Sequence, residues 1–149
     1  MITKPYFDSN VFIELMEGAE FLSFPLRSLM VRLRRRGIPV VSSELVLAEV
    51  LVPARARGGP SLHRSYLDLL VFSGAVELHP ISRTLLYSVA NYRAITGAKV
   101  PDAIHVVTAV QCGCPVILTR DDRMKLPDGL TRIRSDDPDI ATILDAYLQ

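Results

Sequence analysis

Apolar residues along the chain form short unbroken runs that alternate with longer stretches of helical spacing. Unbroken runs are typical of strands covered on both faces, because such strands need apolar side chains at consecutive positions. The strongest run is 115–119 (PVILT). We expect further short strands at 6–7, 38–41, 76–78 and 131–134.

Between these runs, apolar residues recur every three to four positions, the spacing of one helix face. The stretch 19–36 shows this spacing over several turns and carries arginines just before Gly37. Cations are favourable there because the carbonyl end of a helix is negative. Pro25 lies within the pattern, and we expect it to start or kink this helix.

A second helix is expected to begin at Ser42 or Ser43, whose hydroxyl can cap it, and to stop at Pro53. The stretch 55–60 (RARGGP) is the clearest predicted loop, because glycine and proline break regular structure. Further helices are predicted over 61–72, 82–97, 101–113 and 140–148.

This alternation of strands and helices predicts an α/β fold, a three-layer α/β/α sandwich with a mostly parallel central sheet. The 149 residues suit a single domain over 1–149. A hydrophobic share of 49% excludes intrinsic disorder, and no apolar run reaches the roughly 18 residues of a membrane span. The opening MITKPYFD lacks a signal-peptide pattern, so we expect a cytoplasmic protein.

Three acidic residues fall at strand ends or at the helix starts beside them. Asp8 follows the first predicted strand, Asp121 follows PVILT, and Asp102 lies in the first turn of the helix that Pro101 opens. Ligands gather at the carboxyl ends of parallel strands, so these acids are candidates for one site. Each also has a structural explanation, as a helix cap, a turn residue or a partner of the helix dipole.

Glu49 is harder to explain as a surface residue. On a helix that begins near Ser43, it projects from the side that carries Leu45 and Val46. Glu44, by contrast, lies about 140° around the helix axis from Glu49. An unpaired carboxylate on a buried face is costly, so Glu49 is expected to have a cation, either an arginine or a metal shared with the other acids.

Three or four carboxylates without imidazole or thiolate suit hard cations such as Mg²⁺ or Mn²⁺. These ions neutralise phosphate oxygens and activate water for phosphodiester cleavage. Cys112 and Cys114 make no zinc set with the scattered histidines, and we expect two reduced, mostly buried thiols.

The formal net charge of +1 hides a segregation along the chain. Residues 27–64 hold eight arginines against two glutamates, a net +6, whereas residues 1–26 have a net charge of −3 and residues 65–149 of −2. A polyanion could bind this basic zone, which could equally be a solvated helix end.

Four segments resemble, in order, the motifs of PIN-domain nucleases. YFDSNVFIELM resembles the first and places an acid at Asp8, and SSELVLAEVL resembles the second with Glu49. VPDAIHVVTAVQCG resembles the third with Asp102, and PVILTRDDRM resembles the fourth with Asp121. Met124 stands where the fourth motif often has Phe, and Asp122 leaves open which of the adjacent acids binds metal.

The resemblance implies a PIN-like fold and a metal-dependent ribonuclease whose Mg²⁺ or Mn²⁺ is held by the acids Asp8, Glu49, Asp102 and Asp121. The compact length is similar to that of VapC-type toxins, which implies a homodimer, an RNA substrate and a small antitoxin laid across the acidic groove. The basic zone at 27–64 is then expected to steer the RNA backbone.

Three further residues are candidates for orienting the metal shell or a water: Asn10, Thr119 and Asp122. Each has a turn or strand-end alternative. His105 lies one turn after Asp102 on the same side of its helix, and we expect it to be a core or supporting residue rather than a general base.

Other functions remain open at this point. The chain could be an inactive PIN-fold module that binds RNA or protein, or a housekeeping RNA-processing nuclease. A dehalogenase-like phosphatase needs a second Asp two residues after the first, where Asn10 stands. A receiver domain is disfavoured because no acidic pair precedes the strand-end Asp.

Overall fold

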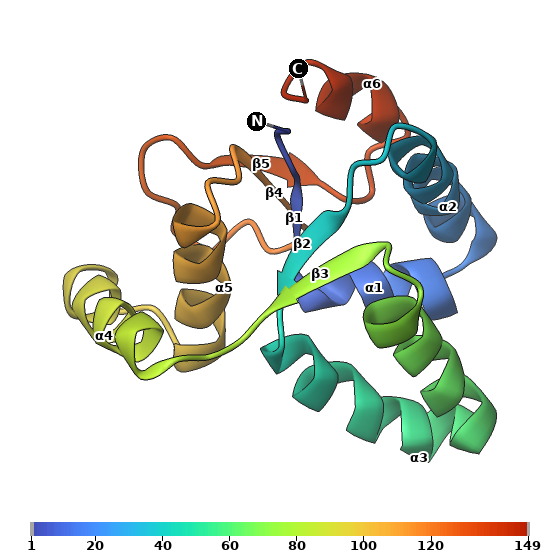
Figure 1. Ribbon diagram of the computed structural model, residues 1–149, viewed down its shortest axis with the longest axis horizontal. Helices are drawn as coiled ribbons and strands as arrows, with labels where there is room; N and C mark the ends of the chain where they lie inside the picture. Colours follow the sequence, from blue (N-terminus) through green and yellow to red (C-terminus); the bar gives the residue numbers. More distant parts are fainter. Residues whose placement is uncertain (1, 149) are drawn as a thin grey trace.

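The computed structural model describes residues 2–148, without the side chains of residues 53–55 (Figure 1). Helices and strands alternate through this part of the chain. The first half holds β1 (Tyr6–Phe7), α1 (Ser9–Glu17), α2 (Glu20–Arg35), β2 (Val40–Ser43), α3 (Leu45–Leu67) and the π-helical turn η1 (Asp68–Phe72). The second half holds β3 (Val76–His79), α4 (Arg83–Thr96), α5 (Val100–Gln111), β4 (Val116–Thr119), β5 (Thr131–Arg134) and α6 (Ile140–Asp145).

The five strands form one parallel sheet in the order β3-β2-β1-β4-β5. The chain moves outward from β1 through β2 to β3, and then returns to the other side of β1 as β4 and β5. β1 pairs with β4 through Tyr6 with Ile117 and Phe7 with Leu118. The gap between β1 and β4 is therefore the switch point of the sheet, the place where ligands bind in open parallel folds.

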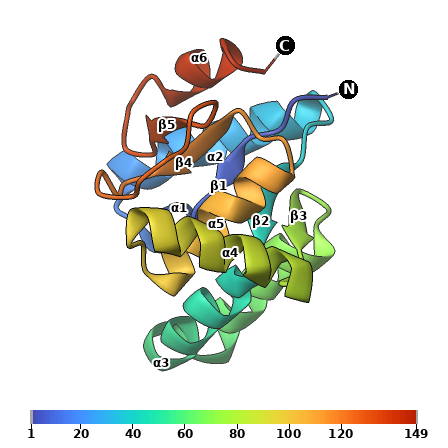
Figure 2. The same ribbon diagram turned by 90° about the vertical axis from the view of Figure 1, so that its left-hand side faces the viewer.

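Consecutive side chains of each strand pack on opposite faces of the sheet. Phe7 and Leu118 point into a core built mainly with α1, α2, α3 and α6. Tyr6 and Ile117 point to the other face, where α5 covers the sheet. α4 packs on α5 rather than on the strands, as Figure 2 shows. The predicted α/β/α sandwich is confirmed, with a sheet that is parallel throughout.

The loop predicted at 55–60 is reduced to a break at a single residue. Helical structure continues past residue 53, where we expected the first helix to stop, and α3 as a whole spans Leu45–Leu67. The helix breaks at Gly59, whose φ of 62° lies in the left-handed region that glycine adopts without a steric penalty. The break gives a bent helical arm that extends beyond the sheet (Figure 1, bottom).

Pro25 does not start its helix, because α2 begins at Glu20 and includes the proline. Ser82 caps α4 by accepting a hydrogen bond from the Leu85 N–H, and Gly97 ends it with φ 70°. Within residues 2–148, no helix is both long and apolar enough to cross a membrane.

Leu29 and Val31, both on α2, test the core assignment. Leu29 is 1% exposed and Val31 is 50% exposed. We expect Leu29→Ala to lower the free energy of unfolding by about 2–5 kcal/mol, because it leaves a cavity in the core. Val31→Ala is expected to change it by only about 0.5 kcal/mol. Urea unfolding followed by circular dichroism measures both, and equal losses would contradict the packing described here.

Candidate functional site

Asp8 lies in the short connection between β1 and α1 and is only 4% exposed. Its Oδ1 accepts the Ser9 N–H at 2.8 Å, which makes it the cap of α1. Its Oδ2 accepts the Thr119 hydroxyl at 2.8 Å. Both carboxylate oxygens are thus held, so this buried side chain has one defined orientation.

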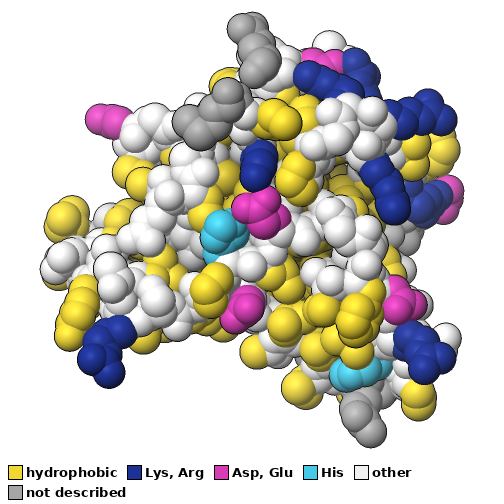
Figure 3. All heavy atoms as spheres, viewed as in Figure 1, with side chains coloured by type: hydrophobic (Ala, Val, Ile, Leu, Met, Phe, Trp, Pro, Cys, Tyr) yellow, Lys and Arg dark blue, Asp and Glu magenta, His cyan; other side chains and the backbone are white. Residues whose placement is uncertain are grey.

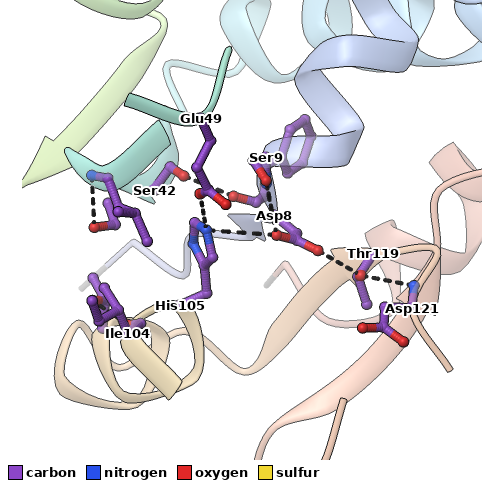
Figure 4. Close-up of polar contacts among 12 residues, drawn as sticks. Asp8, Ser9, Ser42, Glu49, Ile104, His105, Thr119 and Asp121 are labelled. Carbon is purple, nitrogen blue, oxygen red and sulfur yellow. Dashed lines mark hydrogen bonds and ion pairs between the residues drawn. The ribbon is translucent and has the colours of Figure 1, made fainter. Parts of the chain in front are cut away.

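Thr119 connects Asp8 with Asp121 across the switch point. Its Oγ1 donates to Asp8 and accepts the Asp121 N–H at 3.0 Å (Figure 4). The Asp121 side chain accepts the Arg123 N–H at 2.9 Å, which orders the turn after β4. The sequence-based candidate Thr119 therefore lies between two of the candidate acids and positions both.

Asp102, in the first turn of α5, lines a hollow of about 540 Å³ together with Asp121 and Asn10. Burial raises the pKa of Asp102, and the negative charges of Asp121 and Asp8 raise it further. Three aspartates from three separate segments therefore direct their charges at one place. A cation bound there would relieve this repulsion.

Glu49 lies on α3 and is joined to Asp8 through a histidine. His105 Nε2 is 2.7 Å from Glu49 Oε1 and 3.7 Å from Asp8 Oδ1 (Figure 4). His105 Nδ1 is 2.7 Å from the Tyr6 hydroxyl, and the imidazole is 1% exposed. Glu49 thus has His105 as a partner, where an arginine or a shared metal was expected, and the burial of His105 agrees with the core or supporting place expected for it.

Two other candidates lie differently. Asn10 is exposed at the rim of the hollow, whereas Asp122 forms an ion pair with Arg134 and does not line the hollow. Asp121 rather than Asp122 therefore faces Asp102. Cys112 and Cys114 are free thiols, and burial raises the pKa of both.

The donors at this site fit a hard cation better than any other group. Asp8, Asp102 and Asp121 offer only carboxylate oxygens, the ligands that Mg²⁺ and Mn²⁺ prefer. Among residues 2–148, no three acid, His or Cys side chains are close enough to form a ready-made metal cage. The arrangement is an acidic wall beside an open hollow, which leaves room for waters and a phosphate in the coordination shell.

Sequence reasoning missed a second buried carboxylate, Glu14 on α1. Its Oε2 accepts the Ser135 hydroxyl at 2.9 Å, and its Oε1 lies 3.3 Å from Arg120 Nε. Burial raises the pKa of Glu14 despite these two partners. The signal was present in the sequence, because Glu14 interrupts the apolar run of the first motif just as Glu49 interrupts the second.

The arginines of α2, which form the first part of the basic zone, lie away from these acids. Arg32 and Arg36 form ion pairs with Asp145 of α6, and Arg36 also donates to the Leu148 carbonyl. α2 ends just before β2 begins, so these arginines lie at the amino edge of the sheet, opposite the acids. Figure 3 shows Lys and Arg side chains gathered over α2 at the upper right. The α2 arginines are therefore poorly placed to steer RNA towards the acids, whereas Arg57 and Arg64 of the basic zone lie on α3, and the Arg55 side chain lies outside the described residues.

With the fold and the acidic site described, the relationship to known proteins is clear. A family model described as PIN domain matches residues 6–130. The chain belongs to the PIN domain family. No curated protein sequence matches it at a significant level.

Solved structures of toxin–antitoxin systems share this PIN fold. A chain of VapBC2 from Rickettsia felis, bound to a DNA fragment from its promoter, has a TM-score of 0.70 at 14% identity. The match covers 89% of this chain and 98% of that chain. VapC20 from Mycobacterium tuberculosis, described as a Sarcin-Ricin loop cleaving toxin, has a TM-score of 0.65 at 14% identity. The match covers 81% of this chain and 92% of the VapC20 chain. A chain of a toxin–antitoxin complex from Klebsiella pneumoniae has a TM-score of 0.62 at 21% identity. The match covers 85% of this chain and 95% of that chain.

Thr119→Val tests the link between Asp8 and Asp121. Valine has the shape of threonine but leaves buried Asp8 Oδ2 without its donor, so we expect the free energy of unfolding to fall by about 1–3 kcal/mol. Thr108→Val is the matched control, because the buried Thr108 hydroxyl donates only to the Ile104 carbonyl of its own helix. Thr108→Val is expected to lower the free energy of unfolding by less than about 1 kcal/mol, and urea unfolding measures both variants. Equal decreases in the free energy of unfolding would contradict a stabilising hydrogen bond from Thr119 to Asp8.

Proposed function

We propose that this PIN domain is a metal-dependent ribonuclease that hydrolyses RNA phosphodiester bonds. The observation that carries the proposal is that Asp102 and Asp121 line one open hollow at the switch point of the sheet, close enough to the buried Asp8 for both negative charges to raise the pKa of Asp102. Mg²⁺ or Mn²⁺ held by these acids would supply charge neutralisation and an activated water. Glu49 is the fourth acid of the proposed set.

The protein's own residues would prepare this chemistry by fixing the acids. Thr119 and Ser9 hold the Asp8 carboxylate, and Thr119 also holds the backbone of Asp121. Glu49 shares His105 with Asp8, and the hydrogen bond from His105 to Glu49 keeps that carboxylate beside the others. A site held in this way does not reorganise when a metal and a phosphate arrive.

The similar structures support a toxin of a toxin–antitoxin pair. Several of them are complexes of such pairs, and the description of VapC20 as a Sarcin-Ricin loop cleaving toxin agrees with the proposed reaction. We propose a small antitoxin as partner and the cytoplasm as location. A small adjacent reading frame for a DNA-binding protein with a polar tail would support this role, and its absence would favour a housekeeping RNA-processing nuclease.

Substitution of the acids tests the nuclease. We expect Asp8→Asn, Asp102→Asn and Asp121→Asn each to reduce Mn²⁺-dependent cleavage of structured RNA at least about a hundredfold, because each removes a charge that binds the metal. Asp122→Asn is the matched control and is expected to cleave within about twofold of the parent, since Asp122 faces Arg134. EDTA is expected to abolish cleavage by the parent.

Two outcomes would contradict this proposal. Full activity of Asp8→Asn and Asp102→Asn would show that these acids do not bind the metal. Intact RNA binding with no Mn²⁺ binding in calorimetry would instead identify an inactive binding module.

We also propose that the chain forms a homodimer through its outer helical layer. Tyr87 and Ile95 on α4 are 68% and 86% exposed, which is costly for apolar side chains in water. Light scattering is expected to give twice the chain mass of 16.5 kDa, and Ile95→Lys to give a monomer. Phe24→Lys on α2, at a residue that is 60% exposed, is the control and should remain dimeric. A monomeric parent would refute the dimer.

A further inference from the structure

Basic residues other than the arginine-rich zone line the acidic hollow. They come from the start of α5 and from the segment after β4, and they are Lys99, Arg120, Arg123 and Lys125. A phosphodiester that approaches Asp102 and Asp121 meets like charges, so cations beside these acids are needed to bind it. The arginines at the amino edge of the sheet are too far around the molecule to do this.

Arg120 differs from the other three because it is anchored by buried acid. Its Nε lies 3.3 Å from Glu14 Oε1 and 3.9 Å from Asp136 Oδ2. The Glu14 side chain is 8% exposed, and the Ser135 hydroxyl fixes its other oxygen. Arg120 therefore lies beside a buried carboxylate to which it forms an ion pair, and it stands directly between Thr119 and Asp121 in the chain.

The terminal nitrogens of Arg120 remain available. Within the described part of the chain, its nearest contacts with acids are made by Nε, and neither Nη1 nor Nη2 makes a hydrogen bond. These two nitrogens carry four N–H donors in a planar fork. Such a fork matches two oxygens of a phosphate.

Arg134 lies near Arg120 and provides a comparison, because acidic side chains already accept hydrogen bonds from all its nitrogens. It shares Asp136 with Arg120, and its side chain is 42% exposed against 43% for Arg120. All three of its nitrogens, however, donate to Asp122 or Asp136, and it does not line the hollow. The two arginines thus have the same exposure but different capacity for a ligand.

We propose that Arg120 is the phosphate-binding residue of the site, which holds a phosphodiester group of the RNA strand beside the Asp102–Asp121 wall. The inference rests on the proposed ribonuclease function and adds the residue that positions its substrate. Glu14 acts through Arg120 as a positioning residue, because it orients the guanidinium without reaching the hollow.

The test is RNA binding by the full chain carrying Asp102→Asn, which prevents cleavage, in the presence of Mn²⁺. A fluorescein-labelled single-stranded RNA of mixed sequence is titrated, and anisotropy is recorded at several NaCl concentrations. Arg120→Lys keeps a cation for Glu14 but loses the fork, so affinity is expected to fall roughly five- to tenfold with an unchanged salt slope. Arg120→Gln is expected to bind more weakly and to reduce the salt slope by about one.

Arg134→Lys and Arg134→Gln are the matched controls, and both are expected to bind within about twofold of the parent. The melting temperature of Arg120→Lys is expected to stay within about 2 °C of the parent, which separates a binding loss from a folding loss. The inference is overturned if Arg120→Lys binds as tightly as the parent, or if the Arg134 variants lose as much.

Failure of this inference can be told apart from failure of the proposed function. If the chain with intact Asp102 cleaves RNA with Mn²⁺ while the Arg120 variants bind normally, the nuclease stands and Arg120 is not its phosphate-binding residue. If the parent chain neither cleaves nor binds RNA, both are overturned.

Discussion

The pairing of β1 with β4 is the interaction on which the rest of the site depends. Because β4 returns beside β1, the Asp8 N–H donates to the Leu118 carbonyl at 3.1 Å, and Thr119 comes to lie against the Asp8 carboxylate. Residues more than a hundred positions apart thereby share one carboxylate–hydroxyl contact. Asp121 and Asp102, two of the other candidate acids, lie close to this contact.

Bringing several carboxylates together opposes folding, since like charges repel and burial removes their water. The structure limits this cost by giving the most buried acids their own polar partners. Asp8 has Thr119 and Ser9, Glu49 has His105, and Glu14 has Ser135. Among residues 2–148, the Asp102 side chain has no such partner, and burial together with the charges of Asp121 and Asp8 raises its pKa. The position that most needs a cation therefore faces the open hollow.

Basic residues of this molecule gather at both edges of the sheet. At the amino edge of the sheet, arginines of α2 pair with Asp145 and help to attach α6. At the carboxyl edge, a smaller set of cations surrounds the acids. A formal net charge of +1 is thus the sum of two separate arrangements, one structural and one suited to an anionic ligand.

What the sequence determined by itself was local: the positions of the strands, most helix ends and the acids at strand ends. Periodicity and capping depend on neighbouring residues, which is why Asp8, Asp102 and Asp121 could be placed correctly on their elements. The continuity of α3 past residue 53 was misjudged, because tertiary packing can override the local tendency of proline and glycine to break a helix.

Only the tertiary structure decided which side chains meet. It joined Glu49 to His105 and Glu14 to Ser135, pairs separated by 56 and 121 positions. It also placed the arginines of α2 at the edge of the sheet opposite the acids, and Arg120 in the lining of the hollow beside Asp102 and Asp121. The physical reason is that such contacts follow from the strand order β3-β2-β1-β4-β5, which no local pattern in the chain encodes.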